Sequence, residues 1–124
     1  MAPHSLVTTA AALFGITGLG GVLMVGMRIS GKDRPPAWLA MLHGVLATAA
    51  LTLLLFAAWT VGLPQVAQFA LVVLIFAAIG GAAIHLLFHW KTEPLPLPLL
   101  SFHGMLALVG FLFLLIAIFL KSPP

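Results

Sequence analysis

The sequence contains no cysteine, no tyrosine and very few charged residues. The absence of cysteine excludes disulfides, thiolate metal sites, iron–sulfur clusters and covalently attached haem. Charged residues make up 6% of the 124 residues, whereas soluble domains average about 25%. Five basic and two acidic residues are too sparse to form the basic surface of a nucleic-acid-binding protein. These absences exclude a soluble enzyme, a disulfide-rich secreted domain and a nucleic-acid binder.

Hydrophobic residues make up 63% of the chain, and the mean hydropathy is +1.26. A helix needs about 20 apolar residues to cross a bilayer. Stretches of that kind cover residues 6–27, 37–63, 66–90 and 99–120. No positively charged region precedes the first stretch, so we expect this helix to be retained and not cleaved as a signal peptide. We predict an all-α membrane protein, with residues 1–124 forming a single transmembrane domain in an up-down-up-down bundle of four helices.

The basic residues predict the orientation of this bundle. Arg28, Lys32, Arg34 and Lys91 lie in the two long connectors, whereas Lys121 lies at the other end of the bundle. Short cytoplasmic loops carry an excess of Lys and Arg. We therefore expect a multi-pass protein of a bacterial-type inner (cell) membrane, with both termini outside the cytoplasm.

The chain also resembles itself at an offset of 60 residues, which aligns residues of about 4–64 with those of about 64–124. The informative matches are Gly20-Gly21 with Gly80-Gly81 and His43-Gly44 with His103-Gly104. This repeat predicts that the bundle is a duplicated two-helix hairpin with a pseudo-two-fold axis along the membrane normal. His43 and His103 would then face each other across the bundle. The alternative is a chance match in a biased composition.

Histidines near the predicted cytoplasmic ends of the helices are the candidate functional residues. His43, His85 and His103 each lie roughly 6 to 9 Å in from the end of the helix, and His89 lies one turn beyond His85 on the same face. Ionisable residues inside a membrane usually face the bundle interior and serve a function. Both acidic residues fall in the connectors, so such a site would consist of imidazoles alone.

Three roles suit these imidazoles. They could hold haem b as axial ligands from facing helices, or bind Cu or Zn as a three- or four-histidine site. They could also only form hydrogen bonds, relay protons or line a lipid or quinone pocket. We favour haem because Gly44 and Gly104 beside the paired histidines would leave room for a porphyrin.

Within the haem interpretation, His43 and His103 are the first choice of axial ligands, and His85 with one of them is the second. His89 would then serve a propionate, a quinone or the membrane interface. Arg34 and Lys91 would pair with the haem propionates. The predicted cofactor-binding residues are His43, His103, His85, His89, Gly44, Gly104, Arg34 and Lys91.

With its four helices and these histidines, the chain resembles the small four-helix membrane b-type cytochromes. That group includes membrane anchor subunits of respiratory dehydrogenases and cytochrome b561-like proteins. The resemblance implies bis-histidine haem b and electron exchange with quinones. No histidine lies in the outer half of any predicted helix. We therefore expect one haem near the cytoplasmic face. A second haem and a bound quinone are further possibilities.

The predicted function is a membrane haem b protein that passes single electrons. We expect a small subunit of a larger respiratory or photosynthetic complex, embedded in the lipid bilayer, and not a stand-alone enzyme. The first alternative is a cofactor-free accessory or assembly subunit that packs against a large membrane complex. The second is a histidine-based metal-binding membrane protein.

Overall fold

A computed structural model describes residues 3–120 of the chain. It contains α1 (Pro3–Ile29), α2 (Ala37–Thr60), α3 (Gln65–Ile84) with its continuation as a π-helical turn η1 (His85–His89), and α4 (Leu97–Phe119). Residues 3–120 form no strand. Four helices are long and apolar enough to cross a membrane, which confirms the predicted all-α membrane class. Lys121, which the orientation argument uses, falls outside the described residues.

Prolines explain where most helices begin. Pro36, Pro64 and Pro96 each occupy the position before a helix, where a missing N–H and a fixed φ are tolerated. α4 begins at Leu97, before the predicted start at residue 99, because Pro98 fits within a first turn. α2 ends at Thr60, before the predicted residue 63, and Gly62 then turns the chain with φ of 75°.

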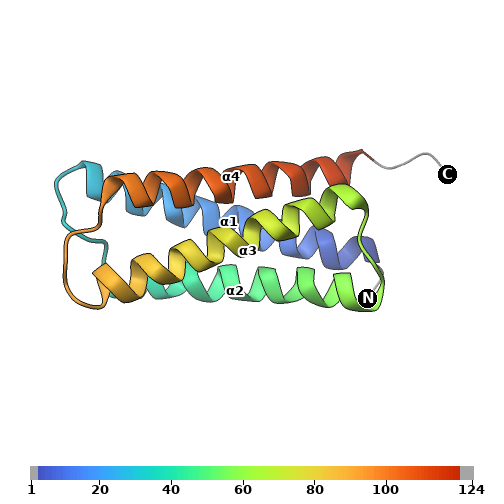
Figure 1. Cartoon of the computed structure of the whole chain (residues 1–124), viewed down its shortest axis with the longest axis horizontal. Helices are drawn as coiled ribbons and strands as arrows, with labels where there is room; N and C mark the ends of the chain where they lie inside the picture. The colour runs from blue at the N-terminus through green and yellow to red at the C-terminus, as the bar shows by residue number, and fades with distance from the viewer. Residues whose placement is uncertain (1–2, 121–124) are drawn as a thin grey trace.

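Consecutive helices run in opposite directions in Figure 1. The start of α1, the α2–α3 connector and the end of α4 lie at one end of the bundle, and both long connectors lie at the other. α1 packs mainly against α2, and α3 mainly against α4; packing of α1 on α4 and of α2 on α3 is sparser. The molecule is thus two closely packed hairpins, and α2 lies diagonally opposite α4.

The densest part of the core lies toward the end that holds the α2–α3 connector. Leu54 and Leu114, 60 residues apart, are its largest fully buried side chains. Alanines surround them, and small side chains let membrane helices approach closely. The buried residues of this cluster are Leu6, Ala10, Ala11, Leu54, Ala57, Leu63, Ala67, Ala70, Leu71, Leu74 and Leu114. The histidines of α2, α4 and η1 occupy the other half of the bundle.

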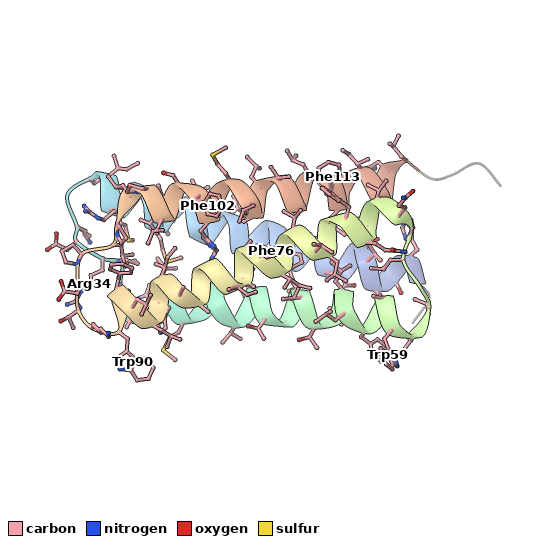
Figure 2. All side chains as sticks on the ribbon, viewed as in Figure 1. Arg34, Trp59, Phe76, Trp90, Phe102 and Phe113 are labelled. Carbon is pink, nitrogen blue, oxygen red and sulfur yellow. The ribbon has the colours of Figure 1, made fainter. Side chains whose placement is uncertain are left out.

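At this histidine-bearing end, the second long connector is bonded both to the last turn of α1 and to the first long connector. Arg28 Nε donates a hydrogen bond to the backbone oxygen of Leu95 at 2.9 Å, and the Leu95 N–H donates to the oxygen of Asp33 at 3.0 Å. Leu95 is buried, so these bonds satisfy polar backbone groups away from solvent. Figure 2 shows Arg34 and Trp90 at this end and Trp59 at the other.

Candidate functional site: an opposed imidazole pair

The first half of the site is His43, which points from α2 toward α1. Its Nδ1 lies 2.9 Å from the backbone oxygen of Thr17. A carbonyl oxygen only accepts, so the imidazole donates and its proton is on Nδ1. The ring lies beside Gly21, where an added Cβ would come within 3.3 Å of the ring carbon Cε1. A glycine on α1 therefore makes the space that the ring fills.

The second half of the site repeats the first, 60 residues later. His103 on α4 donates from Nδ1 to the backbone oxygen of Ala77 on α3 at 2.8 Å. Its ring lies beside Gly81, where an added Cβ would come within 2.8 Å of Cε1. In each hairpin, the first helix thus supplies the carbonyl oxygen and the glycine that position the imidazole of the second helix.

The two imidazoles meet across the bundle. The ring centroids of His43 and His103 are 6.2 Å apart, and the ring planes make an angle of 70°. Both side chains are half-buried. The structure therefore brings together the two histidines that the sequence predicts to face each other, from helices on opposite corners of the bundle.

This arrangement suits a metal ion held between two histidines. A histidine that donates its Nδ1–H to a carbonyl keeps the lone pair of Nε2 free and oriented, as most metal-binding histidines do. Two metal–nitrogen bonds of about 2 Å each, together with the half-widths of two rings, would separate the centroids by roughly 6 Å. The observed separation of 6.2 Å fits such a pair. The donor set is consistent with the two axial positions of a haem iron.

The structure pairs His85 with His89, although the sequence offered His85 as an alternative partner for His43 or His103. The His85 and His89 rings are stacked, with centroids 5.2 Å apart and an interplanar angle of 17°. His89 donates from Nε2 to the backbone oxygen of Pro35 at 3.1 Å. Within residues 3–120, no group of three or more histidine, cysteine or acidic side chains could hold a metal ion. The described residues thus provide no three- or four-histidine site for Cu or Zn.

The other predicted site residues lie away from the paired rings. Gly44 and Gly104 are exposed, and a Cβ added at either one would meet nothing within 4 Å. They therefore make no room beside an imidazole, contrary to the reason for selecting them. Arg34 is half-buried in the first long connector, and Lys91 is exposed in the second.

Sequence reasoning missed the role of Gly21 and Gly81. Both stand in the aligned Gly-Gly pairs, which the sequence indicates only as part of the repeat. The signal was present, because each lies in the helix before its histidine at the same spacing of 22 residues. Hollows of about 210 Å³ also flank the site, one lined by Gly20 and His43 and the other by Gly80 and His103.

The fold and site define a four-helix membrane bundle with an opposed, internally repeated imidazole pair. No protein-family model, no curated protein and no solved structure matches the chain.

Proposed function

We propose that the chain is a membrane haem b protein that passes single electrons, with His43 and His103 as the axial ligands. The observation that carries this proposal is the opposition of two imidazoles at 6.2 Å, each fixed by an Nδ1 hydrogen bond to a carbonyl oxygen. When bound, the haem supplies an iron that cycles between two oxidation states by one electron.

The residues of the chain would hold this group rather than react with substrate. Thr17 and Ala77 accept the Nδ1 hydrogen bonds through their backbone oxygens, which orients the rings and makes Nε2 a better donor. Gly21 on α1 and Gly81 on α3 leave the space that the two imidazole rings occupy. Arg34 and Lys91, at the same end of the bundle, remain the proposed partners of the propionates.

The repeat supports a duplicated hairpin as the origin of this site. Residues 60 apart occupy matching places: Leu54 and Leu114 are fully buried, and His43 and His103 each bond to a carbonyl oxygen 26 positions earlier. We propose that the two hairpins are related by a pseudo-two-fold axis along the membrane normal, that both termini lie outside the cytoplasm of a bacterial-type cell membrane, and that the haem site lies toward the cytoplasmic face.

We also propose that the chain works as a small subunit of a larger respiratory or photosynthetic complex. Every helix exposes large apolar side chains, such as Leu19 on α1, Phe56 on α2, Phe76 on α3 and Phe102 on α4. Such a surface suits lipid and a membrane-embedded partner equally well. A quinone is the electron carrier that the resemblance implies, and the apolar hollows beside each histidine offer it space.

The experiment that tests the haem proposal is an absorption spectrum of the detergent-purified protein, oxidised and then reduced with dithionite, with haem quantified on the same sample. We expect sharp reduced bands of low-spin haem b and about one haem per chain. His43→Ala and His103→Ala should each lose these bands, since either change removes an axial ligand. His4→Ala is the matched control and should retain them.

Other outcomes would overturn the proposal in distinguishable ways. Wild-type protein with no haem, when the cells supply haem, would favour the cofactor-free accessory subunit. Loss of haem in His85→Ala together with its retention in His43→Ala would identify a different ligand pair. A circular dichroism spectrum of each variant separates loss of a ligand from loss of the helical fold.

A further inference from the structure

His85 and His89 form a second imidazole cluster that the haem site does not use. The residues 60 positions earlier, Val25 and Ile29, are aliphatic, so only the second hairpin carries this pair. Both histidines are half-buried. They lie in the last turn of the apolar segment Gln65–His89, next to the connectors. Because the two histidines lie where the apolar segment meets the connectors, they are close to water and still part of the helix.

The backbone here is a π-helical turn. The Trp90 N–H donates to the His85 oxygen at 2.8 Å, five residues back along the chain. Turns of this type occur at the C-terminal ends of helices, and this one ends the apolar segment Gln65–His89. Here the turn holds the two rings one above the other, 5.2 Å apart, with Trp90 edge-on to His85 at 6.2 Å.

The hydrogen bond of His89 determines which of its nitrogens is free. The ring donates from Nε2 to the oxygen of Pro35, which only accepts, so the lone pair of His89 is on Nδ1. Pro35 is buried, so the hydrogen bond to its oxygen holds the His89 ring toward the interior of the bundle. A histidine with one nitrogen bonded to a carbonyl oxygen and the other free is the usual state of a metal ligand.

We propose that His85 and His89 bind a divalent transition-metal ion through one imidazole nitrogen each, with water or an external ligand in the other positions. The two rings are neighbours one turn apart on the same face. Their stacked planes are nearly parallel, so a rotation of the rings about their side-chain bonds brings one lone pair from each to a single ion. Imidazole ligands suit Cu(II), Ni(II) and Zn(II), and Cu(II) binds most tightly in the usual order of affinities. The site shares no residue with the His43–His103 pair and stands independently of the haem proposal.

The test is a Cu(II) titration of the detergent-purified full chain, made without a polyhistidine tag. Electron paramagnetic resonance would report nitrogen coordination in the bound Cu(II). We expect the His85–His89 site to account for about one bound Cu(II) per chain, measured as the difference between the wild type and His85→Ala. His85→Ala and His89→Ala should each lower the affinity for Cu(II) by at least about tenfold. Removing only a hydrogen-bond partner of a metal ligand already lowers metal affinity by that factor.

His4→Ala controls for binding near the N-terminus and should leave Cu(II) affinity unchanged. His43→Ala and His103→Ala should also retain Cu(II), whatever they do to haem. Cu(II) binding that survives in both His85→Ala and His89→Ala, or that disappears in His4→Ala, would overturn the proposal.

A second measurement needs no variant. Diethyl pyrocarbonate modifies free imidazoles, and mass spectrometry locates the modified residues. Bound Cu(II) should protect His85 and His89 of the wild-type protein and leave His4 reactive. Equal modification of His85 and His89 with and without Cu(II) would contradict the site even if a variant failed to fold.

Discussion

At the scale of single residues, Gly21 and Gly81 differ in how tightly an imidazole lies against them. A Cβ at Gly81 would come within 2.8 Å of the His103 ring, and a Cβ at Gly21 within 3.3 Å of the His43 ring. Gly81→Ala should therefore displace its ring and destabilise the fold by about 1–3 kcal/mol, the usual effect of overpacking. Gly21→Ala should have a smaller effect. Thermal unfolding in detergent, followed by circular dichroism, measures both.

Gly104→Ala is the matched control for these glycine variants. It lies next to His103, but nothing is within 4 Å of the added Cβ. Alanine favours a helix by about 1 kcal/mol over glycine, so this variant should unfold at the same temperature as the wild type or higher. A Gly81→Ala protein as stable as Gly104→Ala would show that the ring of His103 is not held against α3.

The sequence was informative about which histidines meet and less so about which glycines matter. The repeat offset places His43 and His103 at matching positions, and a bundle with antiparallel neighbours then opposes them. The glycine next to each histidine was selected for its proximity along the chain. In a helix, however, adjacent residues point about 100° apart, so Gly44 and Gly104 face outward. The space for a ring is made on the neighbouring helix.

At the scale of elements, α1 and η1, the continuation of α3, end in the same type of cap with different residues. After α1, the N–H of Lys32 donates to the oxygen of Met27, and Gly31 has φ of 102°. After η1, the N–H of Glu93 donates to the oxygen of Phe88, and Thr92 has φ of 61°. Glycine takes this left-handed position freely, whereas a β-branched residue is strained there.

Thr92→Gly should therefore stabilise the protein. The left-handed conformation is unfavourable by roughly 1–2 kcal/mol for a residue that has a Cβ. Removing that strain should raise the midpoint of thermal unfolding in detergent. Thr92→Ala is the control, because it removes the hydroxyl and branch but keeps the Cβ, and it should gain much less. Equal midpoints for the glycine and alanine variants would show that φ at this position is not the source of strain.

Four long apolar stretches made the helices themselves predictable. The π-helical turn was not, because one additional residue within a helix leaves the apolar pattern almost unchanged. The turn nevertheless shifts the cap: the left-handed residues Gly31 and Thr92 are 61 positions apart, whereas His43 and His103 are 60 apart. The proline before the next helix follows five positions after Gly31 but four positions after Thr92, so Pro36 and Pro96 return to the offset of 60.

At the scale of the whole molecule, the two hairpins depend on each other in two places. The buried cluster around Leu54 and Leu114 joins them at one end. At the other end, Leu95 of the second long connector is bonded to Arg28 of α1 and to Asp33 of the first long connector. The imidazole pair lies between these two attachments. This placement lets each hairpin fix its own histidine while the bundle as a whole sets the distance between the rings.

The proposed orientation of the molecule in the membrane rests on how its basic residues are distributed. Four of the five, Arg28, Lys32, Arg34 and Lys91, belong to the connector end of the bundle. Positive charges near short loops are retained in the cytoplasm. Alkaline phosphatase, which is active only outside the cytoplasm, should therefore be active when fused to the C-terminus and inactive when inserted after Gly31 with residues 32–124 following it.

Green fluorescent protein, which is fluorescent when it folds in the cytoplasm, should give the complementary pattern at the same two fusion points. The basic residues can then be tested as the cause. Lys32→Ala with Arg34→Ala should increase phosphatase activity of the fusion after Gly31, since removing two of the four charges weakens the bias that retains this connector. Lys121→Ala should not, because its charge opposes that bias. Phosphatase activity after Gly31 in the wild type would place the connectors, and the imidazole pair near them, on the outer face.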